Sequence, residues 1–239
     1  MCTSIIHRNS SGEFGIGFNR DESVKRKSSL VPSVFSSKNG YYLCPVDGDF
    51  GGTWIGVTSK RKIFAILNYY EATLKLVRNA KSRGLIVKDL LSGELSEEEL
   101  STTDLSLYYP FRIISLDQDS AILYVWNGEI LALEERNLEW EVIASSFMLG
   151  AEGEVYRKKV FEEQFYPKAK SKKFVDLASE FLSSHEPEKG AKSPCMHRRD
   201  AHTQSQTIIT IEKNIARMSY KQGQPCETKD FEQYELELS

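Results

Sequence analysis

The stretch that decides the fold is the opening of the chain, Met1-Cys2-Thr3-Ser4-Ile5-Ile6-His7-Arg8. Residues 2–7 are β-prone and predict a strand that starts at Cys2. Removal of Met1 before this small residue is expected, which leaves Cys2 with a free α-amine beside its own thiol. Such an amine has an unperturbed pKa of about 7.7–8.0, so it is partly neutral near pH 7 and can take the thiol proton. Many proteins begin with Met-Cys without such a role, so the following residues must decide.

The next segment is predicted to fold back and place a cluster of polar residues near Cys2. Ser10-Ser11-Gly12 predicts a turn, and residues 13–18 predict a second strand that forms a hairpin with the first. This strand leads into Asn19-Arg20-Asp21-Glu22, which the hairpin register places near Cys2. A guanidinium there would favour the thiolate, and a carboxylate could hold the α-amine. The alternative is a solvated loop that ends the strand.

Composition restricts the function classes. The 239 residues are 40% hydrophobic and 27% charged with a net charge of −3, which argues against a nucleic-acid binder. The sequence has neither an apolar run long enough to span a membrane nor a secretory signal. Its four cysteines form no CxxC pair and suit free thiols in a reducing compartment. We therefore expect a soluble, cytoplasmic protein with one domain over 1–239, in which the acidic tail 226–239 is loosely held.

The remaining elements are predicted to be antiparallel strand pairs with helices between them. Residues 23–50 are predicted to be an irregular loop. Strands are expected at 53–58, 63–70, 112–116, 121–126, 129–133, 140–146, 208–212 and 215–220. Helical segments are expected at 82–91, 95–100, 152–165 and 172–183. Because strands follow one another in pairs, the fold class is α+β with antiparallel sheets, and a parallel nucleotide-binding sheet is excluded.

One amide side chain stands out at a strand end. Asn68 closes the predicted strand 63–70, where its N–H could stabilise a developing oxyanion. The alternative is a strand-end Asn that bonds its own backbone.

Several motifs occur in a characteristic order. They are the initial Met-Cys, NRDE at 19–22, GGTWIG at 51–56, LNYY at 67–70, SRGL at 82–85, CMHRRDA at 195–201 and TQSQT at 203–207. With this set the chain resembles the NRDE family, also called the transport and Golgi organisation 2 family. That family is in turn similar to N-terminal-nucleophile hydrolases of the bile-salt hydrolase and penicillin V acylase type.

The resemblance implies an αββα four-layer sandwich and a set of site residues. Cys2 would be the nucleophile, its freed α-amine the base, and Arg20 and Asp21 the groups that orient and polarise it. Asn68 resembles the oxyanion-hole Asn.

Further residues are candidates for contacting the substrate or the oxyanion. The acylases separate their Arg and Asp by two residues, so both Asn19 and Arg20 remain candidates for the position of their Arg. Ser145-Ser146 stands where the acylases carry a second Asn, and Trp54 of GGTWIG is included in this group.

Three functions remain open. The first is a cysteine hydrolase of a linear amide, or of a thioester, acting on a small-molecule acyl substrate without a cofactor. The second is a non-enzymatic haem or lipid trafficking protein, in which Cys195 and His197 could supply a soft ligand. Together with His202 these two form only a partial metal set, so no metal site is expected. The third is a retired enzyme that keeps the fold for interaction.

Overall fold

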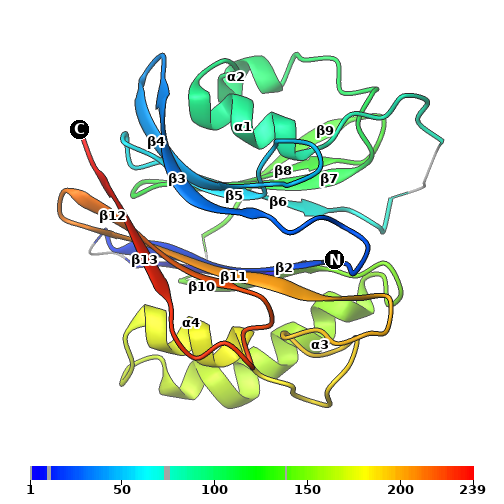
Figure 1. Cartoon of the computed structure of the whole chain (residues 1–239), viewed down its shortest axis with the longest axis vertical. Coiled ribbons are helices and arrows are strands. Elements are labelled where there is room, and N and C mark those ends of the chain that lie inside the picture. Colours follow the sequence, from blue (N-terminus) through cyan, green and yellow to red (C-terminus); the bar gives the residue numbers. More distant parts are fainter. Residues whose placement is uncertain (1, 10–11, 73–75, 138) are drawn as a thin grey trace. The chain divides into compact units, whose positions relative to one another are not determined.

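The chain divides into two compact units. The computed structural model describes residues 2–9, 12–72, 76–137 and 139–239 (Figure 1). The six-stranded unit comprises Met1–Arg26, Leu138–Glu212 and Arg217–Tyr234, and the seven-stranded unit comprises Lys27–Asn137, Lys213–Ala216 and Glu235–Ser239. The single domain over 1–239 stays a prediction.

The six-stranded sheet has the order β10-β1-β2-β11-β12-β13. Its strands are β1 (Cys2–Arg8), β2 (Phe14–Ser23), β10 (Trp140–Ser145), β11 (Ala201–Glu212), β12 (Ile215–Gln222) and β13 (Glu232–Glu237). Strand β1 pairs antiparallel with both β10 and β2, and β2 pairs antiparallel with β11. Part of the acidic tail forms β13 at the sheet edge.

The predicted hairpin between the first two strands is confirmed. Cys2 lies opposite Arg20, and Thr3 lies opposite Asn19. The alternative, in which residues 19–22 form a solvated loop that ends the strand, is wrong, because β2 continues to Ser23. Pairing with β11 on the other side of β2 gives these polar residues ladder partners, which holds them in the strand. Ser10 and Ser11 of the predicted turn lie outside the described residues.

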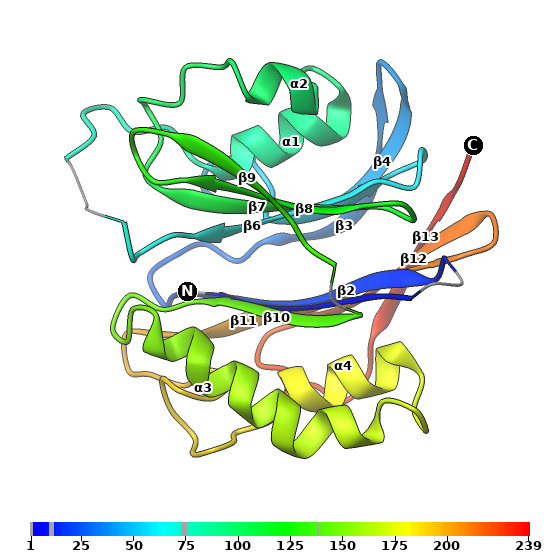
Figure 2. The ribbon, with the colours of Figure 1, turned by 180° about the vertical axis from the view of Figure 1, so that it is seen from behind.

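Helices cover one face of the six-stranded sheet (Figures 1 and 2). They are α3 (Glu152–Val160), which continues as one π-helical turn over Phe161–Phe165 and a short 3-10 turn over Tyr166–Lys168, and α4 (Phe174–Leu182). The apolar side chains of α4 fall at helical spacing and face the sheet. The core between helices and sheet is formed by Ile5, Val142, Val160, Phe161, Phe165, Leu177, Ala178, Phe181, Leu182 and Ile208.

The seven-stranded sheet runs in chain order from β3 to β9. Its strands are β3 (Leu30–Ser37), β4 (Gly40–Val46), β5 (Ile55–Thr58), β6 (Ile63–Asn68), β7 (Phe111–Leu116), β8 (Ala121–Trp126) and β9 (Leu131–Glu135). Each neighbouring pair is antiparallel. Helices α1 (Gly84–Ser92) and α2 (Glu97–Leu100) lie on one face of this sheet (Figure 1).

The irregular loop predicted over residues 23–50 is wrong in its larger part, because it contains the hairpin β3–β4. Strand β3 is an edge strand whose side chains are mostly exposed, so it lacks the hydrophobic alternation that marks a strand. Pro32 lies within it, which an edge strand tolerates.

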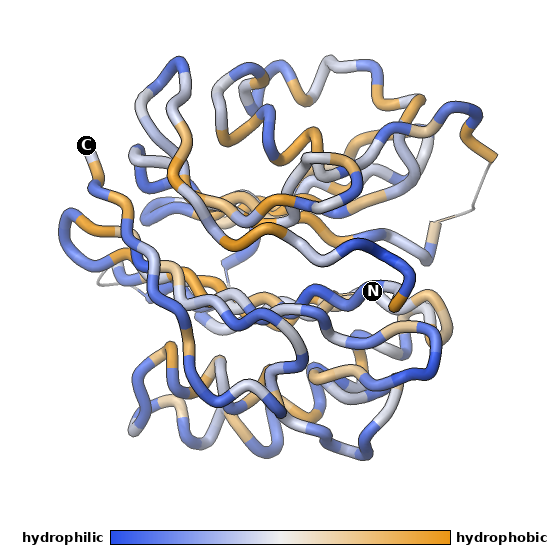
Figure 3. Tube along the Cα trace, in the orientation of Figure 1, coloured by the Kyte–Doolittle hydropathy of each residue, from blue (hydrophilic) through white to orange (hydrophobic). Residues whose placement is uncertain are grey.

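The predicted fold class is confirmed: the chain is α+β with two antiparallel sheets and few helices. Hydrophobic and hydrophilic residues are mixed along the helices, as amphipathic packing requires (Figure 3). Within the described ranges, no helix is both long and apolar enough to cross a membrane.

Candidate active site around Cys2

Cys2 lies on β1, an interior strand whose two neighbouring strands each contribute a polar side chain. Its register partners are Arg20 on β2 and Ser145 on β10. The Cys2 backbone nitrogen donates to Ser145 Oγ at 3.1 Å, and its carbonyl oxygen accepts from Arg157 Nη1 at 3.4 Å. Only 9% of Cys2 is exposed. The backbone of Cys2 is therefore held from two sides, and the nitrogen that would become the α-amine already has a hydroxyl partner.

Neighbouring residues of the NRDE segment point to opposite faces of the sheet, because side chains alternate along a strand. Asn19 faces the helices, where its amide donates to the carbonyl oxygens of Leu182 and Pro194 at 2.7 and 2.9 Å. Arg20 lies on the other face, opposite Cys2. The segment thus supplies a guanidinium beside the cysteine and anchors the sheet to its helices at the same time.

The carboxyl group of Asp21 is buried on the helix side with two partners. Thr203 Oγ1 donates to Asp21 Oδ1 at 2.6 Å, and Arg157 Nη2 lies 3.9 Å from Asp21 Oδ2. Arg157 comes from α3 and is fully buried. Since its guanidinium also reaches the Cys2 carbonyl, Arg157 connects the carboxylate to the backbone of the cysteine.

A β-bulge positions the partner of Arg20. The pairing of β11 with β2 shifts between Thr203 and Ser205, which leaves Gln204 as the extra residue. Gln204 Oε1 accepts from Arg20 Nη1 at 3.0 Å, while its Nε2 donates to the Ser23 carbonyl at 2.8 Å. Glu22 adds an ion pair to Arg20 at 3.5 Å. Arg20 is therefore fixed by an amide and a carboxylate.

The two serines that end the predicted strand 140–146 differ in role. Ser145 bonds the Cys2 nitrogen, as described above. The Ser146 hydroxyl accepts the N–H of Leu149 at 3.1 Å, and Gly153 of α3 packs closely against its side chain. Ser145 is thus part of the surroundings of Cys2, whereas Ser146 organises the turn into α3.

Burial dominates the electrostatics of the site. Desolvation raises the pKa of the Cys2 thiol, and the charge of Asp21 raises it further, although the backbone N–H of Asp21 and the charge of Arg20 oppose this. Burial also raises the pKa of Asp21, against the opposing effects of Arg157 and the Thr203 hydrogen bond. A thiol with a raised pKa is a poor nucleophile by itself, so chemistry at Cys2 needs a base.

Asn68 and Trp54 belong to the seven-stranded unit. Asn68 is the last residue of β6, which ends two residues before the predicted end at Tyr70, and its amide donates to the Tyr70 hydroxyl. Trp54 is buried, and its carbonyl accepts the N–H of Ile66 at 2.9 Å.

A cavity of about 820 Å³ lies in the six-stranded unit at the far end of β1, beside His7, Trp140 and Phe174. His7 is five residues from Cys2, which corresponds to roughly 17 Å along a strand. This cavity is therefore separate from the surroundings of Cys2.

A second polar cluster lies in the same unit. Cys195, His197, His185 and Cys226 bring their ligand atoms within 4.8 Å of one another. His202, which the sequence suggested as a third ligand, is outside this group and forms a β-bridge with His197. All four cysteines of the chain are free thiols.

Sequence reasoning missed three residues around Asp21 and Arg20. Arg157 could have been found, because within the predicted helix 152–165 it shares one face with Gly153 and Val160, an unusual place for a charge. Thr203 and Gln204 lie in the TQSQT motif, but only the bulge and the strand register show what they bind.

Solved structures with a similar fold are N-terminal-nucleophile hydrolases. The Caenorhabditis elegans orthologue of N-acylethanolamine-hydrolyzing acid amidase matches 87% of this chain and 92% of its own, with a TM-score of 0.58 and 14% identity. A mutant of the conjugated bile acid hydrolase from Clostridium perfringens matches 100% of this chain and 98% of its own, with a TM-score of 0.52 and 12% identity. These similarities show the fold alone: the chain shares the fold of these hydrolases.

The family follows from the sequence comparison. The family model Transport and Golgi organisation 2 matches residues 1–222, so the chain belongs to this family. Its mouse homologue is 33% identical over 105 residues, which cover 41% of this chain and 37% of the mouse protein. The human homologue is 32% identical over 109 residues, 43% of this chain and 38% of the human protein. The match thus spans well under half the length of these curated relatives.

Proposed function

We propose that this chain is a cysteine N-terminal-nucleophile hydrolase that cleaves a linear amide bond, with Cys2 as the nucleophile once Met1 is removed. The observation that carries the proposal is the position of Cys2 on β1, an interior strand of its sheet, with Arg20 and Ser145 as its register partners and Arg157 on its carbonyl. Two hydrolases of similar fold are named for amidase and conjugated bile acid hydrolase activities, which supports an amide substrate here.

The reaction begins at the thiol. The neutral α-amine of Cys2 takes the thiol proton, and the thiolate attacks the substrate carbonyl carbon to form a C–S bond. The C–N bond then breaks, and the leaving amine takes the proton from the α-ammonium. Water, activated by the same amine, attacks the thioester and breaks the C–S bond. The carboxylic acid leaves, and the thiol regains its proton. A thioester substrate would follow the same course with a thiol as leaving group.

The surroundings suit these steps. Burial raises the pKa of the thiol, so the reaction depends on a base next to it. The hydroxyl of Ser145 accepts one N–H of the Cys2 nitrogen, which orients the amine. The guanidinium of Arg20 opposes the raised pKa and favours the thiolate. In this proposal Asp21 and Arg157 are positioning residues for the Cys2 backbone.

The decisive experiment compares the wild-type protein with Cys2→Ala and Cys44→Ala. Intact mass after incubation with a thiol-reactive acyl probe should show loss of Met1 and one acyl adduct in the wild type. The adduct should persist in Cys44→Ala, which removes a buried thiol on β4. It should vanish in Cys2→Ala. Retention of Met1, or an adduct that survives loss of the Cys2 thiol, would overturn the nucleophile assignment.

Asn68 is kept as the oxyanion donor in this proposal, on the resemblance given above. One such donor is worth about 10²–10³ in rate, so Asn68→Ala should lower hydrolysis of an amide substrate by that factor. Acyl probe labelling of Cys2 should be weakened less, because labelling by a reactive probe needs less oxyanion stabilisation. Unchanged hydrolysis in Asn68→Ala would remove Asn68 from the site.

The non-enzymatic haem or lipid alternative stays a prediction. Cys195, which the sequence suggested as a haem ligand, is fully buried, and its sulfur lies 3.4 Å from His197 Nε2. Titration with haem, followed by absorbance, distinguishes this alternative from hydrolysis.

A further inference from the structure

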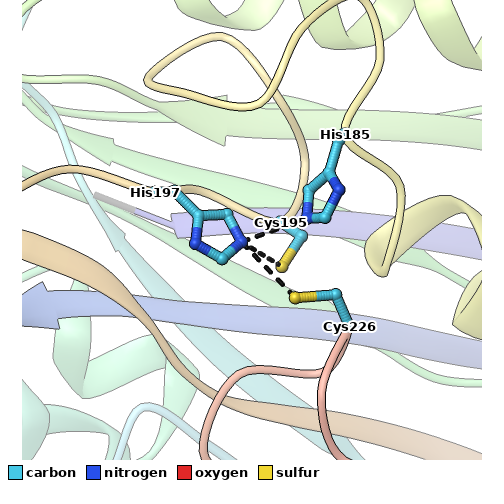
Figure 4. Close-up of side chains that lie close together, drawn as sticks. All are labelled: His185, Cys195, His197 and Cys226. Carbon is cyan, nitrogen blue, oxygen red and sulfur yellow. Dashed lines mark hydrogen bonds between the residues drawn. The ribbon is translucent and has the colours of Figure 1, made fainter.

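Four metal-ligand side chains from separate parts of the sequence converge in the six-stranded unit. His185 follows α4, Cys195 and His197 precede β11, and Cys226 follows β12. Figure 4 shows their side chains pointing toward one another. The ligand atoms of all four lie within 4.8 Å of one another. None of these residues takes part in the hydrolytic chemistry proposed for Cys2.

The contacts within the cluster meet at one atom. His197 Nε2 lies 3.0 Å from His185 Nε2, 3.4 Å from Cys195 Sγ and 3.4 Å from Cys226 Sγ. A neutral imidazole nitrogen carries either one N–H or one lone pair, so it can satisfy only one of these contacts as a hydrogen bond. A cation at the centre of the cluster would satisfy all four ligands together.

We propose that His185, Cys195, His197 and Cys226 bind one structural Zn²⁺ ion. Two cysteines and two histidines form a common closed tetrahedral zinc set, with Zn–N of about 2.0–2.1 Å and Zn–S of about 2.3 Å. In such a tetrahedron the ligand atoms are separated by about 3.3–3.8 Å. The three observed separations, 3.0, 3.4 and 3.4 Å, need only small movements to reach this geometry. Two thiolates and two neutral imidazoles would balance the charge of the ion.

The backbone around the cluster is already organised to present the ligands. The N–H of Cys195 donates to the Ser184 carbonyl at 3.1 Å, which brings it beside His185. The N–H of His197 donates to the Gly190 carbonyl at 3.1 Å. Cys226 lies in a turn in which the N–H groups of Glu227 and Thr228 share the Gln224 carbonyl. The ligands therefore sit on three segments held by hydrogen bonds.

The metal would also stabilise the segment that holds the hydrogen-bond partner of Asp21. Met196, between two of the ligands, donates its N–H to Thr203 Oγ1 at 2.8 Å and accepts the Thr203 N–H at 3.0 Å. Thr203 in turn donates to the carboxyl group of Asp21. A zinc ion at the cluster thus fixes the segment that carries the hydrogen-bond partner of Asp21. Zinc binding at this cluster does not depend on hydrolysis at Cys2.

The test uses the full chain, purified without an affinity tag that binds metal. Elemental analysis by mass spectrometry should find about one zinc per chain after dialysis against a weak chelator. Cobalt added to metal-stripped wild-type protein should give the visible bands of tetrahedral Co²⁺ and a thiolate charge-transfer band. His185→Ala and Cys226→Ser should each weaken zinc binding at least as much as loss of an outer-shell partner, which costs about 10–100-fold.

Matched variants serve as controls. His202→Gln removes a histidine that neighbours the cluster, and Cys44→Ser removes a buried thiol of the other unit; both should keep the zinc and the cobalt spectrum. If a ligand variant fails to fold, the cobalt spectrum of the wild type decides alone. Absence of zinc and of the cobalt bands would overturn the proposal. So would an intact mass short by two thiol hydrogens, which indicates a disulfide, or a haem spectrum that depends on Cys195.

Discussion

The buried contact between Arg157 and Asp21 gives the sharpest test of how the six-stranded unit is stabilised. Arg157→Met keeps most of the side-chain length and removes the charge. It leaves the carboxyl group of Asp21 buried with Thr203 as partner, and it removes the hydrogen bonds to the carbonyls of Cys2 and Ala191. Removing one member of a buried pair costs about 3–5 kcal/mol. We expect a loss of that size in the free energy of unfolding near neutral pH.

The loss should depend on pH in a defined direction. Burial raises the pKa of Asp21 in the folded protein above its value in the unfolded chain, which is about 3.9. The folded protein is therefore destabilised as the pH rises from the unfolded-state pKa through the folded-state pKa. Without the opposing charge of Arg157, the pKa of Asp21 in the folded protein rises further. The loss of stability then extends over a wider range of pH. The deficit of Arg157→Met should therefore be smallest below about pH 4 and grow toward neutral pH.

Urea denaturation followed by circular dichroism measures this deficit at each pH. The matched control is Lys158→Met on the same helix, which removes a partly exposed charge paired with Glu154. Such pairs are worth only about 0.3–0.5 kcal/mol. If Arg157→Met costs no more than Lys158→Met near neutral pH, or if its deficit shrinks as pH rises, the buried-pair reasoning is refuted.

Two further predictions concern packing and hydrogen bonding in the same unit. Thr203→Val removes the donor to Asp21 and should cost about 1.5–3 kcal/mol, the range for a hydrogen bond to a charged group, in urea denaturation. An unchanged midpoint would show that the contact contributes nothing. Gly17→Ala would bring a methyl group to 2.9 Å from Leu182 and should cost about 1–3 kcal/mol, measured by thermal denaturation. Gly190→Ala, which meets nothing within 4 Å, is its control; equal effects would contradict the packing argument.

The sequence was most informative where hydrophobic alternation and local turns decide the structure. The hairpin of β1 and β2, the strand β6 and the helices at 84–92 and 174–182 follow from such patterns. The hairpin β3–β4 was missed, because an edge strand with exposed side chains carries no hydrophobic pattern. The end of β2 was missed, because pairing with β11 outweighs the local preference of four polar residues for a loop.

In the candidate site, too, local contacts could be predicted from the sequence and long-range contacts could not. Cys2 and Arg20 are neighbours through one hairpin, so local register was enough to bring them together. The partners of Asp21 lie 136 and 182 residues away in the chain, on α3 and β11. The cluster of His185 and Cys226 with Cys195 and His197 likewise depends on loops whose positions no spacing rule predicts. Such long-range contacts arise from tertiary packing.

The side chains of Asn19, Arg20 and Asp21 alternate between the two faces of the sheet along β2. This alternation restricts how many residues can separate Arg20 from Asp21. An odd separation between the guanidinium and the carboxylate keeps them on opposite sides of the sheet, whether they are adjacent, as here, or three positions apart, as in the acylase pattern. Inserting or deleting one residue between Arg20 and Asp21 would exchange inside for outside at every later position of the strand. Evolution can therefore lengthen this motif in steps of two, and single-residue indels should be absent from functional descendants.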